Sequence, residues 1–193
     1  MVLTPSTMLP LGTVAPSFEL PDTVSGKTVR LGDLAAKKAL VVMFVCNHCP
    51  YVQHIGVGLA RFGADYAAQD VAIVAISAND PASHPDDGPE RLGAEARRNG
   101  LAFPVLFDES QAVAKAYRAA CTPDFYLFDG KRRLVYRGQF DGARPGSAVP
   151  VTGADLRAAL DALLAGKPVS AQQKPSLGCN IKWRAGNAPD YFG

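Results

Sequence analysis

Residues 39–51 read ALVVMFVCNHCPY, and this stretch decides the fold. It opens with seven apolar residues rich in valine. Such a run is too short for a membrane span and is typical of a strand buried on both faces. After Cys-Asn-His-Cys-Pro, apolar residues return at helical spacing to about Ala68. We therefore predict a central strand followed by a helix, with Cys46 and Cys49 at their junction.

The position of Cys46 and Cys49 at the start of a helix predicts reactive thiols. Residues three apart lie on one side of a helix, so the two sulfur atoms can face the same way and come within disulfide distance. The unpaired N–H groups and partial positive charge of the first turn favour a thiolate. In such motifs the pKa falls from about 8.5 to between about 3.5 and 7.5. We expect the outer thiol, Cys46, to be acidic and accessible.

Composition narrows the class of protein. The chain has 193 residues, of which 48% are hydrophobic and 20% are charged, as expected of one globular domain. A net charge of +2 does not indicate a nucleic acid or membrane partner. We find neither a signal-peptide pattern nor a long apolar run, so we expect a cytoplasmic location with mainly reduced cysteines. C-x-x-C in that setting indicates a thiol redox site needing no organic cofactor and no metal.

The rest of the chain alternates predicted strands with predicted helices. This order predicts a three-layer α/β sandwich, with the cysteines at the carboxyl edge of a central strand. Further strands are expected at residues 71–77 and 103–107 and in hairpins within residues 18–31 and 125–137, and further helices at residues 90–99, 110–120 and 154–165.

The two ends of the chain show little periodicity. Residues 1–15 are rich in proline, so we expect them to be irregular. Residues 168–193 contain Leu177, Ile181 and Trp183 and are too apolar to remain in solvent. We expect this tail to pack back on a domain formed by residues 1–167.

Several motifs resemble the thioredoxin superfamily, in its AhpC/TSA (peroxiredoxin-like) branch, over about residues 10–165. They are GTVAPSFELPD, VVMFVCNHCPYV, FPVLFDESQAVAKAY, and Thr122-Pro123 before DFYLFD. The resemblance implies a thioredoxin-like α/β/α sandwich with a mixed central sheet and an N-terminal hairpin. It also implies a cis-proline at Pro123 that faces the cysteines. More narrowly, the chain resembles a group of uncharacterised thioredoxin-like proteins with a CNHCP centre and a GCNIKW tail, here residues 178–183.

Differences from the peroxiredoxin pattern favour disulfide exchange over peroxide chemistry. That pattern resembles P-x-x-x-T-x-x-C followed by a later arginine that helps to bind peroxide. Aligned on this chain, the peroxidatic cysteine falls on Cys49, the threonine on Cys46, the proline on Val42 and the arginine near Thr122. The expected peroxide-binding groups are therefore replaced, whereas dithiol exchange needs only the cysteine pair.

Our first interpretation is a thiol–disulfide oxidoreductase with Cys46 as nucleophile and Cys49 as resolving cysteine. We expect His48 to stabilise the thiolate and to make the pair more oxidising. Thr122 and Pro123 would line a groove and lend backbone groups to a partner chain. The partners would be a disulfide-bearing protein or a small-molecule thiol or peroxide, with a reducing partner such as a thioredoxin or glutathione system.

Two alternatives stay open. One is a thiol peroxidase in which Cys49 is peroxidatic and Cys46 resolves the oxidised sulfur. The other is a non-catalytic protein that binds Cu(I) or zinc through Cys46, Cys49 and a histidine, since both ions accept soft thiolates.

The remaining candidates are less specific. Cys121 is expected near the centre, either as a second resolving thiol or as a small buried residue. Cys179 could bridge to Cys121, relay to the Cys46–Cys49 pair or simply pack, and packing is favoured. We expect two further histidines to be surface residues and two arginines to flank a loop that could bring positive charge to the centre, namely His54, His84, Arg137 and Arg144.

Overall fold

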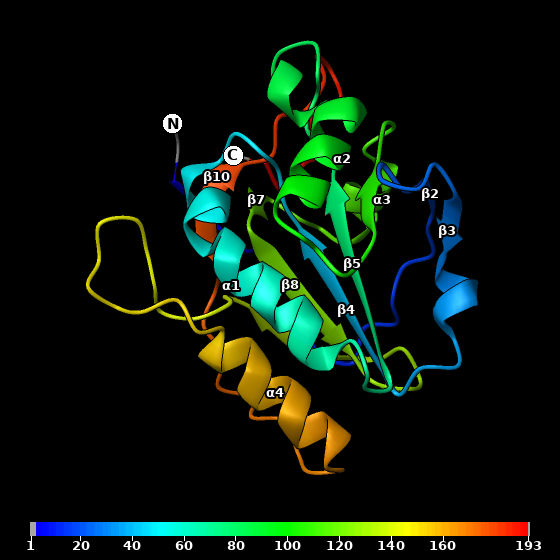
Figure 1. Cartoon of the computed structure of the whole chain (residues 1–193), viewed down its shortest axis with the longest axis vertical. Coiled ribbons are helices and arrows are strands. Elements are labelled where there is room, and N and C mark those ends of the chain that lie inside the picture. Colours follow the sequence, from blue (N-terminus) through cyan, green and yellow to red (C-terminus); the bar gives the residue numbers. More distant parts are fainter. Residues whose placement is uncertain (1–2, 193) are drawn as a thin grey trace.

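The computed structural model describes residues 3–192, and a five-stranded mixed sheet forms its centre (Figure 1). The strands β4, β5 and β6 run parallel, whereas β8 and β9 are antiparallel additions on the other side of β4. The mixed sheet expected from the sequence is therefore confirmed. In order across the sheet, the strands are β6 (Val105–Phe107), β5 (Val71–Ser77), β4 (Ala39–Phe44), β8 (Asp124–Phe128) and β9 (Leu134–Gly138).

The central strand β4 is buried on both faces, as its unbroken apolar run predicts. Every residue of β4 is 0% exposed. Because side chains alternate along a strand, Val41 and Met43 join one half of the core while Val42 and Phe44 join the other. A polar residue at any of these positions would lose its hydration without gaining a partner.

Helices and loops cover the two faces of this sheet unequally. One face packs against α1 (Pro50–Tyr66), α2 (Pro89–Arg98) and α4 (Ala154–Leu164). The other face is covered by the short α3 (Ala112–Ala116), by apolar residues of the N-terminal segment and by Ile181 of the tail. None of the helices within residues 3–192 is both long and apolar enough to cross a bilayer.

The helix α3 is shorter than the predicted helix at residues 110–120. Gln111 and Arg118 have left-handed backbone conformations, with φ of 63° and 51°, and these residues lie outside α3 on either side. The Gln111 side chain donates hydrogen bonds to the carbonyl oxygens of Ala78 and Lys182, at 2.7 and 2.9 Å. Gln111 therefore connects a loop and the C-terminal tail instead of extending the helix.

Short strands and single-turn helices complete the fold. The hairpin of β2 (Glu19–Pro21) and β3 (Thr28–Arg30) confirms the expected N-terminal hairpin. A separate sheet has the order β1-β10-β7, so the expectation that residues 1–15 are irregular is wrong for residues 3–5, which form β1. The strand β1 has three residues and pairs with β10 near the other end of the chain. A segment of this length is too short to show the alternating pattern from which a strand is predicted. The remaining elements are β1 (Leu3–Pro5), β7 (Cys121–Thr122), β10 (Leu177–Asn180) and the 3-10 helices η1 (Leu31–Leu34) and η2 (Pro85–Asp87).

The strand β8 begins with a buried carboxyl group next to Pro123. Asp124 is 0% exposed, and it accepts a 2.8 Å hydrogen bond from the hydroxyl of Tyr126. Burial raises the pKa of Asp124 from 3.8 to about 7 because the interior disfavours the charged form. The folded protein therefore holds a proton here at pH values where the unfolded chain has released it.

We predict that Asp124 makes the protein less stable as the pH rises from about 4 to about 7. In this window the folded state binds more protons than the unfolded state, so the free energy of unfolding falls with increasing pH. The gap between 3.8 and about 7 corresponds to roughly 4 kcal/mol across the window. Urea unfolding of an Asp124→Asn variant should lose that part of the pH dependence. An exposed control, Glu90→Gln, should keep the wild-type slope, and an unchanged slope in Asp124→Asn would contradict the assignment.

Candidate active site: three thiols at the start of a helix

The two cysteines of the CNHC sequence lie between the end of β4 and the start of α1. Val45 extends the parallel pairing, and its N–H donates to the carbonyl oxygen of Ile76 at 3.0 Å. Cys49 is the N-cap residue of α1, and Pro50 occupies the first helical position, where a missing N–H costs little. The predicted strand-to-helix junction is thus present, and it puts Cys46 and Cys49 in one buried cluster.

Thr122 holds both sulfur atoms from the opposite side. The Thr122–Pro123 peptide bond is cis, as the resemblance implies. The Cys46 sulfur lies 3.2 Å from the Thr122 hydroxyl oxygen. The protonated Cys49 thiol donates to the Thr122 carbonyl oxygen, also at 3.2 Å. One residue therefore contacts both thiols through two different oxygen atoms.

The negative charge of the cysteine pair belongs on Cys49. A hydrogen bond from Cys46 lowers the pKa of Cys49 to about 5 despite burial, and a second bond from Cys179 acts in the same direction. Donating that hydrogen bond raises the pKa of Cys46 well above its ordinary value, and burial and the negative charge of Asp87 raise it further. Cys46 and Cys49 are 2% and 0% exposed. The expectation that Cys46 is acidic and accessible is therefore wrong for this structure.

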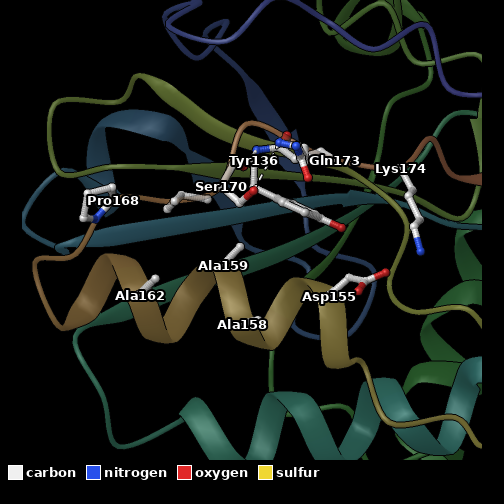
Figure 2. A pocket seen from close by; sticks show the side chains of 11 residues that line it. Tyr136, Asp155, Ala158, Ala159, Ala162, Pro168, Ser170, Gln173 and Lys174 are labelled. Atoms are coloured by element: carbon white, nitrogen blue, oxygen red, sulfur yellow. Dashed lines mark hydrogen bonds between the residues drawn. The ribbon is translucent and has the colours of Figure 1, made fainter.

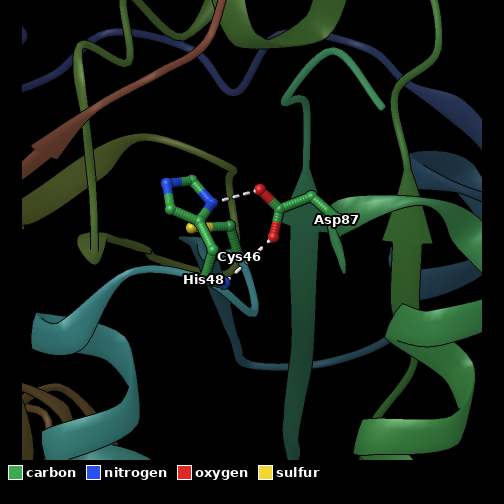
Figure 3. A group of neighbouring side chains, drawn as sticks. All are labelled: Cys46, His48 and Asp87. Atoms are coloured by element: carbon green, nitrogen blue, oxygen red, sulfur yellow. Dashed lines mark hydrogen bonds and ion pairs between the residues drawn. The ribbon is translucent and has the colours of Figure 1, made fainter. Parts of the chain in front are cut away.

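Asp87, in the loop that follows β5, binds to the CNHC turn, which consists of residues 46–49. Its carboxylate accepts hydrogen bonds from the backbone N–H groups of Asn47 and His48, at 2.7 and 3.1 Å, and it also bonds to Nδ1 of the His48 ring (Figure 3). The side-chain amide of Asn79 donates to the same carboxylate at 2.8 Å. Asp87 is itself 0% exposed. These bonds fix the turn that carries the cysteines and orient the imidazole next to Cys46.

Sequence reasoning missed the role of Asp87. Asp87 is the second of two consecutive aspartates in the loop after β5, and such a pair resembles solvent-exposed residues. A signal was available, because this loop and the CNHC turn both follow parallel inner strands and so meet at one edge of the sheet. The expected tuning by His48 stays a prediction, and the structure adds that a buried carboxylate binds its ring.

The C-terminal tail covers the site. Strand β10 lies beside the start of α1 and pairs antiparallel with β7, so that Cys179 is opposite Thr122 (Figure 1). A Cβ atom on Gly178 would lie only 1.9 Å from the carbonyl oxygen of Thr122. Glycine therefore permits this close approach. The Ser176 hydroxyl also donates to the carbonyl oxygen of Pro123. Thr122 and Pro123 thus face the protein's own strand and not the open groove expected from the sequence.

The pairing of β10 with β7 places Cys179 and Cys121 in different surroundings. The sulfur atoms of Cys49 and Cys179 are 2.8 Å apart, so Cys179 lies in contact with the centre. Cys121 contacts the carbonyl oxygen of Pro123 at 3.9 Å, and burial raises its pKa well above the ordinary value. Neighbouring residues of a strand point to opposite faces, so Cys121 and Thr122 diverge, and a Cys121–Cys179 bridge is disfavoured.

The remaining candidates take other positions. His84 is half-buried, and its ring centre lies 4.5 Å from that of His48. His54 is also half-buried. Arg137 donates to Leu9 and Gln173, and Arg144 donates to Gln139 and two backbone carbonyl groups. These bonds fix both guanidinium groups within loops of the protein.

A surface hollow leads towards Cys46. Cys46 is one of the residues that line a pocket of about 70 Å³ next to the CNHC turn. A larger open hollow of about 750 Å³ lies beside it and is lined by His48, Asp86 and Arg91 among others. The pocket and the hollow share Asn47, Gln53, Glu95 and Asn99. Of the two cysteines, Cys46 lines the pocket and Cys49 does not.

A second cavity lies away from the cysteines. It encloses about 320 Å³ between α4 and residues 168–174 and is lined by Tyr136, Asp155 and Lys174 among others (Figure 2). Its lining contains none of the four cysteines. This cavity therefore lies apart from the cysteine cluster.

One group of side chains has the composition of a metal site. A ring nitrogen of His48, a carboxylate oxygen of Asp87 and the Cys46 sulfur lie within 4.8 Å of one another (Figure 3). The bond between Nδ1 of His48 and Asp87 already uses two of the donor groups. A metal ion would have to replace that bond, so the geometry fits a hydrogen-bonded turn better than a vacant set of ligands.

Comparison with known proteins agrees with this geometry. The model of the AhpC/TSA family matches residues 11–137, which include the CNHC turn and Pro123. The chain belongs to the AhpC/TSA family. It is also 28% identical over 145 residues to the thiol-disulfide oxidoreductase ResA of Geobacillus thermodenitrificans, covering 70% of this chain and 74% of that protein. We conclude that this AhpC/TSA chain is a thioredoxin-like redox protein.

Two solved structures extend the similarity across nearly the whole AhpC/TSA chain. An uncharacterised conserved protein from Geobacillus kaustophilus is 52% identical, with a TM-score of 0.93 and coverage of 95% of this chain and 97% of the other. A hypothetical protein from Sinorhizobium meliloti 1021 is 55% identical, with a TM-score of 0.93 and coverage of 95% and 100%. The thioredoxin-like fold is confirmed by a putative thioredoxin from Neisseria meningitidis, which is 23% identical, with a TM-score of 0.61 and coverage of 81% of this chain and 93% of the other.

We predict that the thiolate of this site resides on Cys49 and titrates near pH 5. The ultraviolet absorbance of the reduced protein should show that transition, and Cys49→Ser should abolish it. Cys46→Ala removes the main donor to the thiolate and should raise the midpoint by about one to two pH units. Cys121→Ser is the control and should leave the midpoint unchanged. A transition that survives in Cys49→Ser but is lost in Cys46→Ala would place the charge on Cys46 instead.

Proposed function

We propose that this protein is a thiol–disulfide oxidoreductase in which Cys46 and Cys49 form the exchanging pair. The observation that carries the proposal is the placement of both sulfur atoms in one buried cluster at the start of α1, each 3.2 Å from an oxygen of Thr122, the residue before the cis-proline. The Cys46 thiol donates to Cys49, whose pKa is about 5, at the start of α1 and opposite Pro123. A pair that keeps one negative charge at neutral pH has the nucleophile that exchange requires.

Charge and access assign different roles to the two cysteines. Cys49 holds the charge, whereas Cys46 lines the pocket that joins the surface hollow. When a disulfide reaches Cys46, the Cys46 proton can pass to Cys49 along their hydrogen bond. Cys46 then attacks as the thiolate, in the role of nucleophile, and Cys49 serves first as proton acceptor.

The exchange then follows two balanced steps. The Cys46 sulfur attacks one sulfur of the partner disulfide, which forms a mixed disulfide and releases the other sulfur as a thiolate. That thiolate takes the proton held on Cys49. The Cys49 sulfur next attacks Cys46, which closes the Cys46–Cys49 disulfide and releases the second partner sulfur. The partner gains two electrons and the protein loses two.

The covered site favours particular partners. Because β10 lies on β7, a disulfide of small size or in a mobile segment would reach Cys46 through the hollow more readily than a long extended chain would bind Thr122. The oxidised pair would be returned to dithiol by a reducing partner such as a thioredoxin or glutathione system. We propose a cytoplasmic setting, where such systems keep thiols reduced.

Insulin reduction by dithiothreitol tests the proposal. Wild-type protein should accelerate the appearance of turbidity, because exchange through Cys46 is faster than attack by dithiothreitol alone. Cys46→Ser and Cys49→Ser should fall to the uncatalysed rate, whereas Cys121→Ser should retain the wild-type rate. If Cys46→Ser reduces insulin as fast as wild type, the assignment of Cys46 is wrong. Parallel assays with glutathione disulfide test the preference for small partners.

A thiol peroxidase activity is the second candidate, and the low pKa of Cys49 favours it. In this reaction the Cys49 thiolate attacks a peroxide oxygen and becomes a sulfenic acid, and the other oxygen leaves as water or alcohol. Cys46 then attacks the Cys49 sulfur, which forms the disulfide and releases water. The membership of the AhpC/TSA family supports the same chemistry.

A single-turnover measurement with hydrogen peroxide separates the two candidates. Reduced Cys46→Ser keeps a hydroxyl donor next to Cys49, so a peroxidase should still consume one equivalent of peroxide rapidly. Cys49→Ser should consume none at that rate. Wild-type protein without any rapid phase would reject the peroxidase, while leaving disulfide exchange in place.

A further inference from the structure

The cysteine of the C-terminal strand lies in contact with the exchanging pair. Cys179 is 1% exposed, and its sulfur lies 2.8 Å from the sulfur of Cys49. A disulfide bond measures about 2.05 Å, so less than 1 Å of movement separates the two sulfur atoms from bonding distance. Cys179 also forms one cluster with Cys46 and Cys49.

The protein fixes Cys179 in this position by several independent contacts. Leu3 of β1 and Thr122 of β7 flank it on the two sides of β10. The residues after it are held as well. The N–H of Ile181 donates to Ala120 at 3.0 Å, and that of Lys182 donates to the side-chain oxygen of Asn79 at 2.8 Å. Asn79 in turn bonds Asp87, so the tail and the CNHC turn share one network.

We propose that Cys179 is a third exchange thiol, which takes over the disulfide from Cys46 by bonding to Cys49. The inference rests on the proposed function, which supplies the oxidised pair. In the step, the Cys179 sulfur attacks Cys49, the Cys46–Cys49 bond breaks, and the Cys49–Cys179 bond forms. The proton of Cys179 passes to the departing Cys46 sulfur. No electrons enter or leave, so the protein remains oxidised by two electrons.

The charge of Cys49 controls when this transfer can occur. In the reduced protein, burial and the hydrogen bond to ionised Cys49 raise the pKa of Cys179 to about 12, which keeps it protonated. Once Cys49 is in a disulfide, its negative charge is gone and Cys179 loses the neighbour that opposed its ionisation. The transfer returns Cys46 to the thiol state and ties β10 covalently to the start of α1.

Disulfide mapping tests the proposal. Reduced protein is oxidised with diamide, remaining thiols are alkylated, and the digested peptides are assigned by mass spectrometry. Wild-type protein should give Cys49–Cys179 peptides in addition to Cys46–Cys49, with Cys46 partly alkylated. In Cys179→Ser, Cys46 should lose that alkylation. Cys121→Ser is the matched control and should give the wild-type pattern.

The variant Cys46→Ser isolates the new pairing from the proposed activity. It has three cysteines, and formation of Cys49–Cys179 should lower the thiol content from three to one per chain, leaving Cys121. If this variant keeps three thiols, or loses them only to bonds between chains, the Cys179 proposal is overturned. Wild-type insulin reduction would then still support the exchange function. Conversely, an intact Cys49–Cys179 bond in a protein without insulin or glutathione disulfide reduction would overturn the proposed function alone.

Discussion

The close packing of β10 against β7 is the contact on which the site depends. It requires a residue without a side chain at position 178, because a Cβ there would collide with the Thr122 carbonyl group. With that contact in place, the C-terminal strand covers Thr122 and brings a third sulfur against Cys49. The position that the resemblance assigns to a partner chain is thus occupied by the protein itself.

This covering changes the electrostatics of the cysteine pair. An exposed thiolate at a helix start is stabilised by water as well as by the helix N–H groups. Here Cys46 and Cys49 are both buried, and the charge is stabilised by hydrogen bonds from two neighbouring thiols. Asp87 adds a buried negative group near Cys46 and disfavours a second charge there. Of the three sulfur atoms, Cys49 therefore carries the negative charge, and Cys46 and Cys179 donate hydrogen bonds to it.

Prediction from the sequence succeeded where local pattern and burial coincide. The run before Cys46 predicted the central strand, and the helical spacing after Cys49 predicted α1. It failed for Asp87 and for the proximity of Cys179, because both depend on segments far apart in the sequence. Asp87 lies 39 residues beyond His48, and Cys179 lies 130 residues beyond Cys49. The assignment of acidity to Cys46 failed for a related reason, since the donors around each sulfur come from the tertiary structure.

The sequence by itself determined that this chain builds a strand, a CxxC turn and a helix, because hydrophobic period and helix-start chemistry act within a few residues. It also determined the AhpC/TSA type of fold through motifs spread over residues 11–137. Only the tertiary structure decided which sulfur carries the charge and which third sulfur contacts it. Those properties arise from desolvation and from hydrogen bonds between distant segments, and the order of residues along the chain does not reveal such distances.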